Sequence, residues 1–265
     1  MKPGAASKLQ RVAVSTWSFH RLFERDRDNP NKTLMDVRDF PEMIADRYHV
    51  HNVEIVLPHF GVIEPSLIRD FKGRLEKAHS ALVHMPLDYG ALWNKAAISS
   101  SDPAERDAAL ALYKKGIDAA AALGCPLVRC DPGQVNLADP SITVDSYKQL
   151  AAYAGGKGIK VVVENHGDIS KNPETLVTIL KAAGVGSLPD FGNFPDQETR
   201  ERGLRLLFPI AGNVAHAKLR EGQDFGRCLQ IATDAGFQGI FSVEAGEGDP
   251  YVEVQKTVDA LMEHL

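Results

Sequence analysis

Three acidic residues and one histidine recur along the second half of the 265-residue sequence at intervals of 26, 26 and 28 residues: Glu164, Asp190, His216 and Glu244. Each lies in, or directly after, a short segment of mostly apolar residues. Three carboxylates brought together would repel one another, and a divalent cation would resolve that repulsion. Oxygen-rich ligation with one nitrogen suits Mn²⁺, Mg²⁺ or Co²⁺ and is compatible with Zn²⁺. We therefore predict one divalent metal ion held by these four residues.

The elements that must position these side chains are short strand-like segments alternating with helical ones. The expected strands are 11–16, 52–57, 81–85, 126–130, 158–164, 185–190, 213–218 and 239–244. The expected helices are 39–48, 66–80, 102–124, 144–154, 172–184, 196–208, 225–235 and 251–264. Asp102-Pro103 and Gly124 are typical start and stop signals of a helix. Eight such units in a chain of this length predict a (β/α)₈ TIM barrel of the α/β class.

A doubly wound open sheet is the alternative architecture, and the first strand argues against it. Its fingerprint is a glycine-rich turn after that strand, whereas Trp17-Ser-Phe-His20 follows here. Because no linker-like segment divides the chain, we expect residues 1–265 to form a single TIM-barrel domain, with a flexible N-terminus at residues 1–10. The C-terminal strand ends of such a barrel carry the active site. We therefore expect the four polar residues to converge at the barrel mouth.

The composition disfavours several classes of protein. Hydrophobic residues make up 44% and charged residues 25% of the chain, as in folded soluble proteins. A net charge of −5 argues against nucleic-acid binding, and no apolar run reaches the length of a membrane span. The three cysteines form no CxxC pair, and the first ten residues include no apolar signal segment. We expect free thiols in a cytoplasmic protein.

The motifs around the four polar residues resemble those of the sugar phosphate isomerase/epimerase superfamily, which has a xylose isomerase-like TIM barrel and includes the ketose 3-epimerases. The resemblance spans residues 12–261 and rests on four motifs: Glu164-Asn-His-Gly167, Asp190-Phe-Gly-Asn193, His216-Ala-Lys218 and Glu244-Ala-Gly-Glu-Gly248. Weaker support comes from His84-Met-Pro86 and from residues 123–129. The resemblance implies that the metal ligands are Glu164, Asp190, His216 and Glu244. In the epimerases, the two matching glutamates also move protons at the sugar carbon.

The implied chemistry has a physical basis. A metal bound to a carbonyl oxygen and an adjacent hydroxyl stabilises an enediolate, and a carboxylate beside the carbon serves as the base. We expect Glu164 and Glu244 to be the catalytic residues of a sugar or sugar phosphate isomerase or epimerase. The residues expected to bind the carbohydrate substrate are Trp17, His84, Arg129, His166, Asn193 and Lys218. Glu54 lies inside the second strand, where a role in an internal ion pair is as compatible with the sequence as a role at the site.

Two positions depart from the family patterns. Asn193 stands where several ketose epimerases and a branch of metal-dependent DNA-repair nucleases carry histidine, and Ser170 stands where epimerases often carry glutamate. The main alternative is a metal-dependent lyase or dehydratase acting on a 3-keto-glycoside or a dehydroshikimate-like acid. A non-catalytic sugar-binding barrel and a nuclease are less favoured. The expected partner is a small carbohydrate, and a homo-oligomer is compatible with the sequence.

Overall fold

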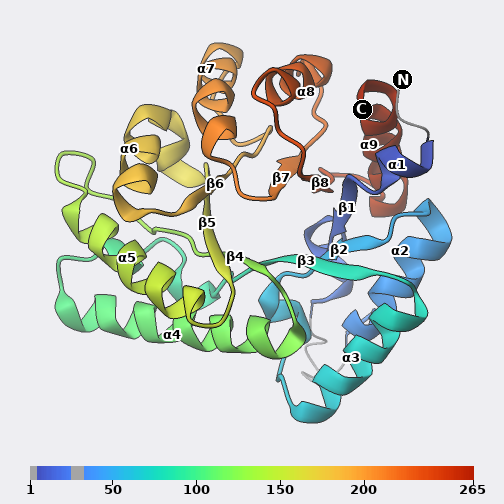
Figure 1. The fold of residues 1–265 in the computed structure, drawn as a ribbon, viewed down its shortest axis with the longest axis horizontal. Helices are drawn as coiled ribbons and strands as arrows, with labels where there is room; N and C mark the ends of the chain where they lie inside the picture. The colour runs from blue at the N-terminus through green and yellow to red at the C-terminus, as the bar shows by residue number, and fades with distance from the viewer. Residues whose placement is uncertain (1–4, 25–32) are drawn as a thin grey trace.

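Parallel strands form a nearly closed barrel surrounded by helices in the computed structural model of this chain, which describes residues 5–24 and 33–265 (Figure 1). The strands are β1 (Val12–Ser15), β2 (Asn52–Glu54), β3 (Ala81–Pro86), β4 (Leu127–Arg129), β5 (Lys160–Glu164), β6 (Gly186–Leu188), β7 (Val214–Ala217) and β8 (Ile240–Val243). Each strand overlaps a segment expected from the sequence, so the predicted TIM barrel is confirmed.

A helix follows each strand and packs on the outside of the barrel (Figure 1). These helices are α2 (Phe40–Tyr48), α3 (Pro65–Lys77), α4 (Pro103–Leu123), α5 (Ser141–Gly155), α6 (Pro173–Ala183), α7 (Gln197–Leu207), α8 (Phe225–Asp234) and α9 (Pro250–His264). Several begin with an aspartate whose side chain accepts a backbone N–H of the first turn, as Asp102 does from Ala104 at 2.9 Å. Such N-caps stabilise a helix start by about 1 kcal/mol. Gly124 follows the last residue of α4, and its φ of 81° favours glycine.

The segment of residues 1–10, which was expected from the sequence to be flexible, is described only in part. Residues 5–9 form the short helix α1 (Ala5–Leu9), while residues 1–4 lie outside the described part of the chain. Lys8 Nζ donates a hydrogen bond to the Met262 carbonyl at 2.7 Å. This bond ties α1 to α9, and the two helices lie side by side near both chain ends in Figure 1.

The barrel interior contains an apolar layer below a polar one. Because successive residues of a strand point to opposite faces, alternate residues share the interior. The lower layer consists of buried side chains from β4, β5, β6 and β7: Leu127, Val162, Leu188 and Val214. Two positions further along the chain, the same strands or their ends carry Arg129, Glu164, Asp190 and His216. The alternation therefore places these polar groups at the C-terminal end of the barrel, above an apolar floor.

The barrel closes between β6 and β7 through isolated contacts. The order of continuously paired strands is β6-β5-β4-β3-β2-β1-β8-β7. At the remaining seam, parallel bridges join Ser187 to Ala211 and Asp190 to His216. The second bridge brings two of the predicted metal ligands together.

Two further expectations concern the membrane and the cysteines. Within the described ranges, no helix combines the length and apolar character that a membrane span needs. Cys125, Cys130 and Cys228 are free and buried, as the sequence led us to expect.

Candidate metal centre and substrate cavity

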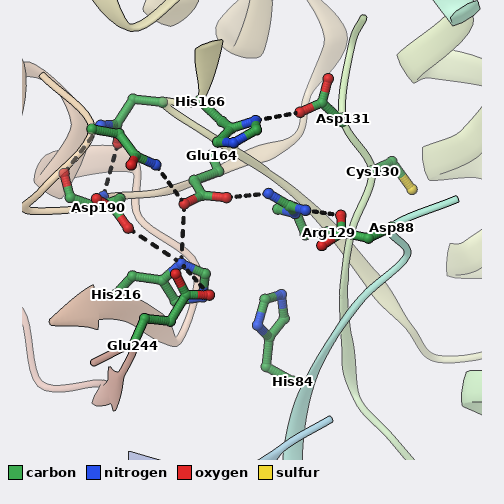
Figure 2. A network of polar contacts seen from close by, with 12 residues as sticks. His84, Asp88, Arg129, Cys130, Asp131, Glu164, His166, Asp190, His216 and Glu244 are labelled. Carbon is green, nitrogen blue, oxygen red and sulfur yellow. Dashed lines mark hydrogen bonds and ion pairs between the residues drawn. The ribbon is translucent and has the colours of Figure 1, made fainter. Parts of the chain in front are cut away.

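Glu164, Asp190, His216 and Glu244 converge at the C-terminal ends of β5, β6, β7 and β8 (Figure 2). One ligand atom from each lies within 4.8 Å of all the others, and all four residues are buried. His216 turns Nδ1 toward the carboxylates, at 3.1 Å from Glu164 Oε1, 3.4 Å from Glu244 Oε1 and 3.5 Å from Asp190 Oδ2. The structure thus assembles the group singled out in the sequence, whose role as ligands stays a prediction.

Local hydrogen bonds fix the ends of β5 and β6 relative to each other. The buried amide of Asn165 accepts the Asp190 N–H at 2.8 Å and donates to the Asp190 carbonyl at 3.0 Å. Asp190 Oδ1 also accepts the Gly192 N–H at 2.7 Å. A Cβ at position 192 would lie 2.8 Å from Lys218 Cδ, so glycine is needed for the close approach of Lys218.

Lys218 lies among the carboxylates of the cluster. Its Nζ is 2.8 Å from both Asp190 Oδ2 and Glu244 Oε2 and donates to Asn193 Oδ1 at 3.2 Å. Burial alone would lower the pKa of Lys218, but the carboxylates, Asp190 first, outweigh it and raise the pKa. Lys218 is therefore a permanent cation beside the predicted metal position.

Arg129 is a second cation beside the cluster. It donates to Glu164 on one side and to Asp88 on the other (Figure 2). Glu164 Oε1 also accepts from Asn193 Nδ2 at 2.9 Å. Burial alone would raise the pKa of Glu164, but the positive charges of Arg129 and His216 outweigh it and hold the pKa well below its usual range. Glu164 is therefore a carboxylate at neutral pH.

Glu54 lies beneath the cluster and connects two histidines. Its Oε2 is 2.7 Å from His84 Nδ1 and 3.1 Å from His216 Nε2, and all three residues are buried. An ionised carboxylate only accepts hydrogen bonds, so the nitrogens that face it carry protons. This contact keeps the Nε2 proton of His216 directed at Glu54, so a metal would replace the proton on Nδ1, which faces the other carboxylates. Outer carboxylates orient ligand histidines in metal sites in the same way.

The placement of His84 differs from the expected substrate contact. His84 is completely buried, bonds to Glu54, and does not line the cavity described below. This geometry favours a role in holding Glu54. The signal for Glu54 in the sequence was an acidic residue inside an apolar strand, which suggested an ion pair but did not identify the partner.

The donor set fits a divalent cation. It offers three carboxylates and one imidazole nitrogen, the combination that suits Mn²⁺, Mg²⁺ or Co²⁺. Asp190 Oδ2 is buried and accepts no hydrogen bond of good geometry, although Lys218 Nζ lies 2.8 Å away. Leaving a buried charged oxygen without such a bond is costly, and a metal ligand bond would satisfy it.

A cavity of about 500 Å³ leads from the cluster to the surface between the loops that follow β1, β3, β4 and β5. Four of the residues expected to bind substrate line it, namely Trp17, Arg129, His166 and Lys218, whereas Asn193 does not. His166 Nδ1 lies 3.0 Å from Asp131 Oδ2, and this hydrogen bond raises the pKa of His166 (Figure 2).

Asp88 and Asp131 are among the acidic residues of the cavity that the sequence analysis missed. Each follows its strand by two residues, since β3 ends at Pro86 and β4 at Arg129. An acidic residue near the C-terminal end of a strand is also what identified the other acidic residues. For Asp88 and Asp131, however, no surrounding motif distinguished the residue from an ordinary turn residue.

Comparison with known proteins gives two kinds of match. The family model described as xylose isomerase-like TIM barrel matches residues 47–264, while a search of curated proteins found no match. A xylose isomerase domain protein from Planctomyces limnophilus is similar in structure, with a TM-score of 0.72, 14% identity and 96% of each chain covered.

Two further solved structures contain ligands. A xylose isomerase-like TIM barrel protein from Mycobacterium smegmatis, in complex with magnesium, has a TM-score of 0.71 and 16% identity over 97% of each chain. D-psicose 3-epimerase from Clostridium cellulolyticum H10, with D-tagatose, has a TM-score of 0.70 and 14% identity over 96% of each chain.

Proposed function

This chain belongs to the xylose isomerase-like TIM barrel family, and from that premise we propose that it is a divalent-metal-dependent isomerase or epimerase acting on a carbohydrate. The observation that carries the proposal is the convergence of Glu164, Asp190, His216 and Glu244, of which Glu164 and Glu244 line the cavity. The magnesium complex of the M. smegmatis protein and the D-tagatose complex of the epimerase support it by similarity of fold.

The four residues would hold the metal, which when bound would polarise a sugar carbonyl and the adjacent hydroxyl and so acidify the neighbouring C–H bond. Glu164 and Glu244 line the cavity from different sides of the barrel, at the ends of β5 and β8. A sugar carbon held between them has one carboxylate near each face. Arg129 keeps Glu164 ionised, so that Glu164 can accept the proton.

The fate of that proton decides the reaction. If Glu244 supplies a proton to the opposite face of the same carbon, the centre is inverted. If a proton returns to the neighbouring carbon, an aldose and a ketose interconvert. Lys218, whose Nζ is 2.8 Å from Glu244 Oε2 and lines the cavity, supplies positive charge where the substrate oxygen becomes negative.

A substrate screen in D₂O tests this proposal. Ketoses, aldoses, sugar phosphates and 3-keto-glycosides would be incubated with the protein and Mg²⁺ or Mn²⁺, and the products followed by NMR. The proposal expects deuterium at the reacting carbon of an isomerised or epimerised product. Unlabelled product, together with no primary isotope effect on substrate deuterated at that carbon, would contradict it. An unsaturated product would show a lyase instead.

A further inference from the structure

Large apolar side chains, partly exposed, line the outer half of the cavity beside the polar Asn94, Lys95 and Gln134. Both tryptophans of the chain line it, together with Leu137. The exposed fraction is 60% for Trp93, 44% for Leu137 and 36% for Trp17, and these three are among the few large apolar residues so exposed in the described part of the protein. Large apolar side chains exposed at the rim of a cavity indicate a ligand that covers them.

The inner half of the cavity is polar and already has its charges paired. Arg129 bonds to Glu164 and Asp88, and Lys218 pairs with Glu244 inside the cavity. Five carboxylates and three cations belong to the described lining.

Lys95, exposed at the rim, is the one cation of that described lining without a carboxylate partner. The loops after β7 and β8, where barrels frequently bind phosphate, contribute only Lys218 and Glu244 to the described lining. Apart from the proposed metal ion, the described lining therefore offers a phosphate group more carboxylates than cations.

We propose that the site takes an uncharged keto-sugar that carries an apolar group in glycosidic linkage, and discriminates against sugar phosphates. The sugar lies at the inner end beside Glu164 and Glu244, and the apolar group lies against Trp93 and Leu137. This inference rests on the proposed function, since it places the sugar at the proposed metal centre. A cavity of about 500 Å³ is in the range that encloses a ligand larger than one sugar ring.

The test compares phenyl and methyl glycosides of the same sugars, with glucose 6-phosphate as the charged probe. Affinity would be measured by calorimetry in Mg²⁺, over the β-glycosides of glucose, galactose and xylose. For the sugar that binds, we expect the phenyl glycoside to bind at least about tenfold more tightly than the methyl glycoside, as burial of a phenyl ring predicts. Glucose 6-phosphate should bind more weakly than glucose.

Substitutions of the cavity residues test where the apolar group binds. Trp93→Ala and Leu137→Ser should bring the phenyl-to-methyl affinity ratio close to one. Val252→Ser, on the exposed surface of α9 and outside the cavity, should leave that ratio unchanged. A ratio near one in the wild type, an unchanged ratio in both cavity variants, or tighter binding of the sugar phosphate would overturn the inference alone. If no sugar or glycoside binds with Mg²⁺ or Mn²⁺, the proposed function fails as well.

Discussion

Asp190 and His216 form a parallel β-bridge across the seam between β6 and β7. On either side of this bridge, the His216 N–H donates to the Pro189 carbonyl at 2.8 Å and the Phe191 N–H donates to the His216 carbonyl at 3.2 Å. The contact that closes the barrel therefore also sets the spacing of two proposed ligands. Because backbone bonds fix this spacing, the site is held in place before a metal binds.

The contact between Glu54 and His216 Nε2 should tune metal binding. Glu54→Gln keeps the shape of the side chain but removes the charge that holds the Nε2 proton, so metal affinity should fall about 10–100-fold. Affinity would be measured by competition with a chelator, and ¹⁵N NMR of the His216 ring would show which nitrogen carries the proton. The matched control is Glu76→Gln, on the exposed side of α3. An unchanged affinity and an unchanged ring spectrum would show that Glu54 has no influence on the site.

Lys218 shares its carboxylate partners with the proposed metal. Lys218→Met removes a positive charge 2.8 Å from Asp190 and Glu244, so metal affinity should stay equal or increase. Turnover should nevertheless fall, by up to about 10²–10³-fold, because a positioned electrostatic donor is lost. Lys148→Met, an exposed change on α5, is the control. Weaker metal binding in Lys218→Met would mean that this lysine supports the ligand geometry instead.

Glu164 and Glu244 are proposed to transfer protons as well as to bind metal. Glu164→Gln and Glu244→Gln keep an oxygen ligand but lose basicity, so at saturating metal each should lose at least about a hundredfold in kcat. Steady-state kinetics over a metal titration separates the two roles. A variant that regains near-normal kcat once metal is added would identify a glutamate that only binds metal. The base would then have to be sought elsewhere, and His166, which lines the cavity, is the first candidate.

His59 should make the fold less stable in acid. Burial, aided by the nearby charge of His20, lowers the pKa of His59 to about 4, and its ring stacks on Phe23 with the centroids 4.8 Å apart. The unfolded chain binds the proton at a higher pH than the folded protein does. Stability is therefore complete above about pH 6.5 and is lost as the pH falls toward 4.

Denaturant unfolding at pH 7 and pH 5 tests this effect. His59→Asn should reduce the loss of stability between these pH values by about 1–2 kcal/mol relative to wild type. The control is His79→Asn, an exposed position whose φ of 51° suits asparagine. Equal losses in wild type and His59→Asn would show that protonation of His59 does not destabilise the fold.

The strands and the four clustered residues could be predicted because both signals are local. Each strand is a short apolar segment. The four clustered residues, such as Glu164 and Glu244, stand at or near the ends of successive strands, so the order of the strands places them at the barrel mouth. The N-terminal helix could not be predicted in this way. The bond from Lys8 to Met262 joins residues 254 positions apart, and no local pattern shows it.

The partners of the buried polar residues also escaped prediction. Glu54 meets His84 after a register shift between β2 and β3 at Val53 and Glu54, which the sequence does not encode in any periodic pattern. Arg129 lines the cavity, where it was expected to contact substrate, and the sequence did not identify its partners Glu164 and Asp88. The partners of these buried residues depend on which side chains face one another across the barrel interior.

Metal analysis of purified protein tests the central claim most directly. Wild type should bind one divalent ion per chain, whereas Asp190→Asn and His216→Ala should lose most of it while circular dichroism shows an intact fold. Asp145→Asn, which alters an exposed carboxylate of α5, should retain the full metal content. Equal metal in wild type, Asp190→Asn and His216→Ala would contradict the proposed centre.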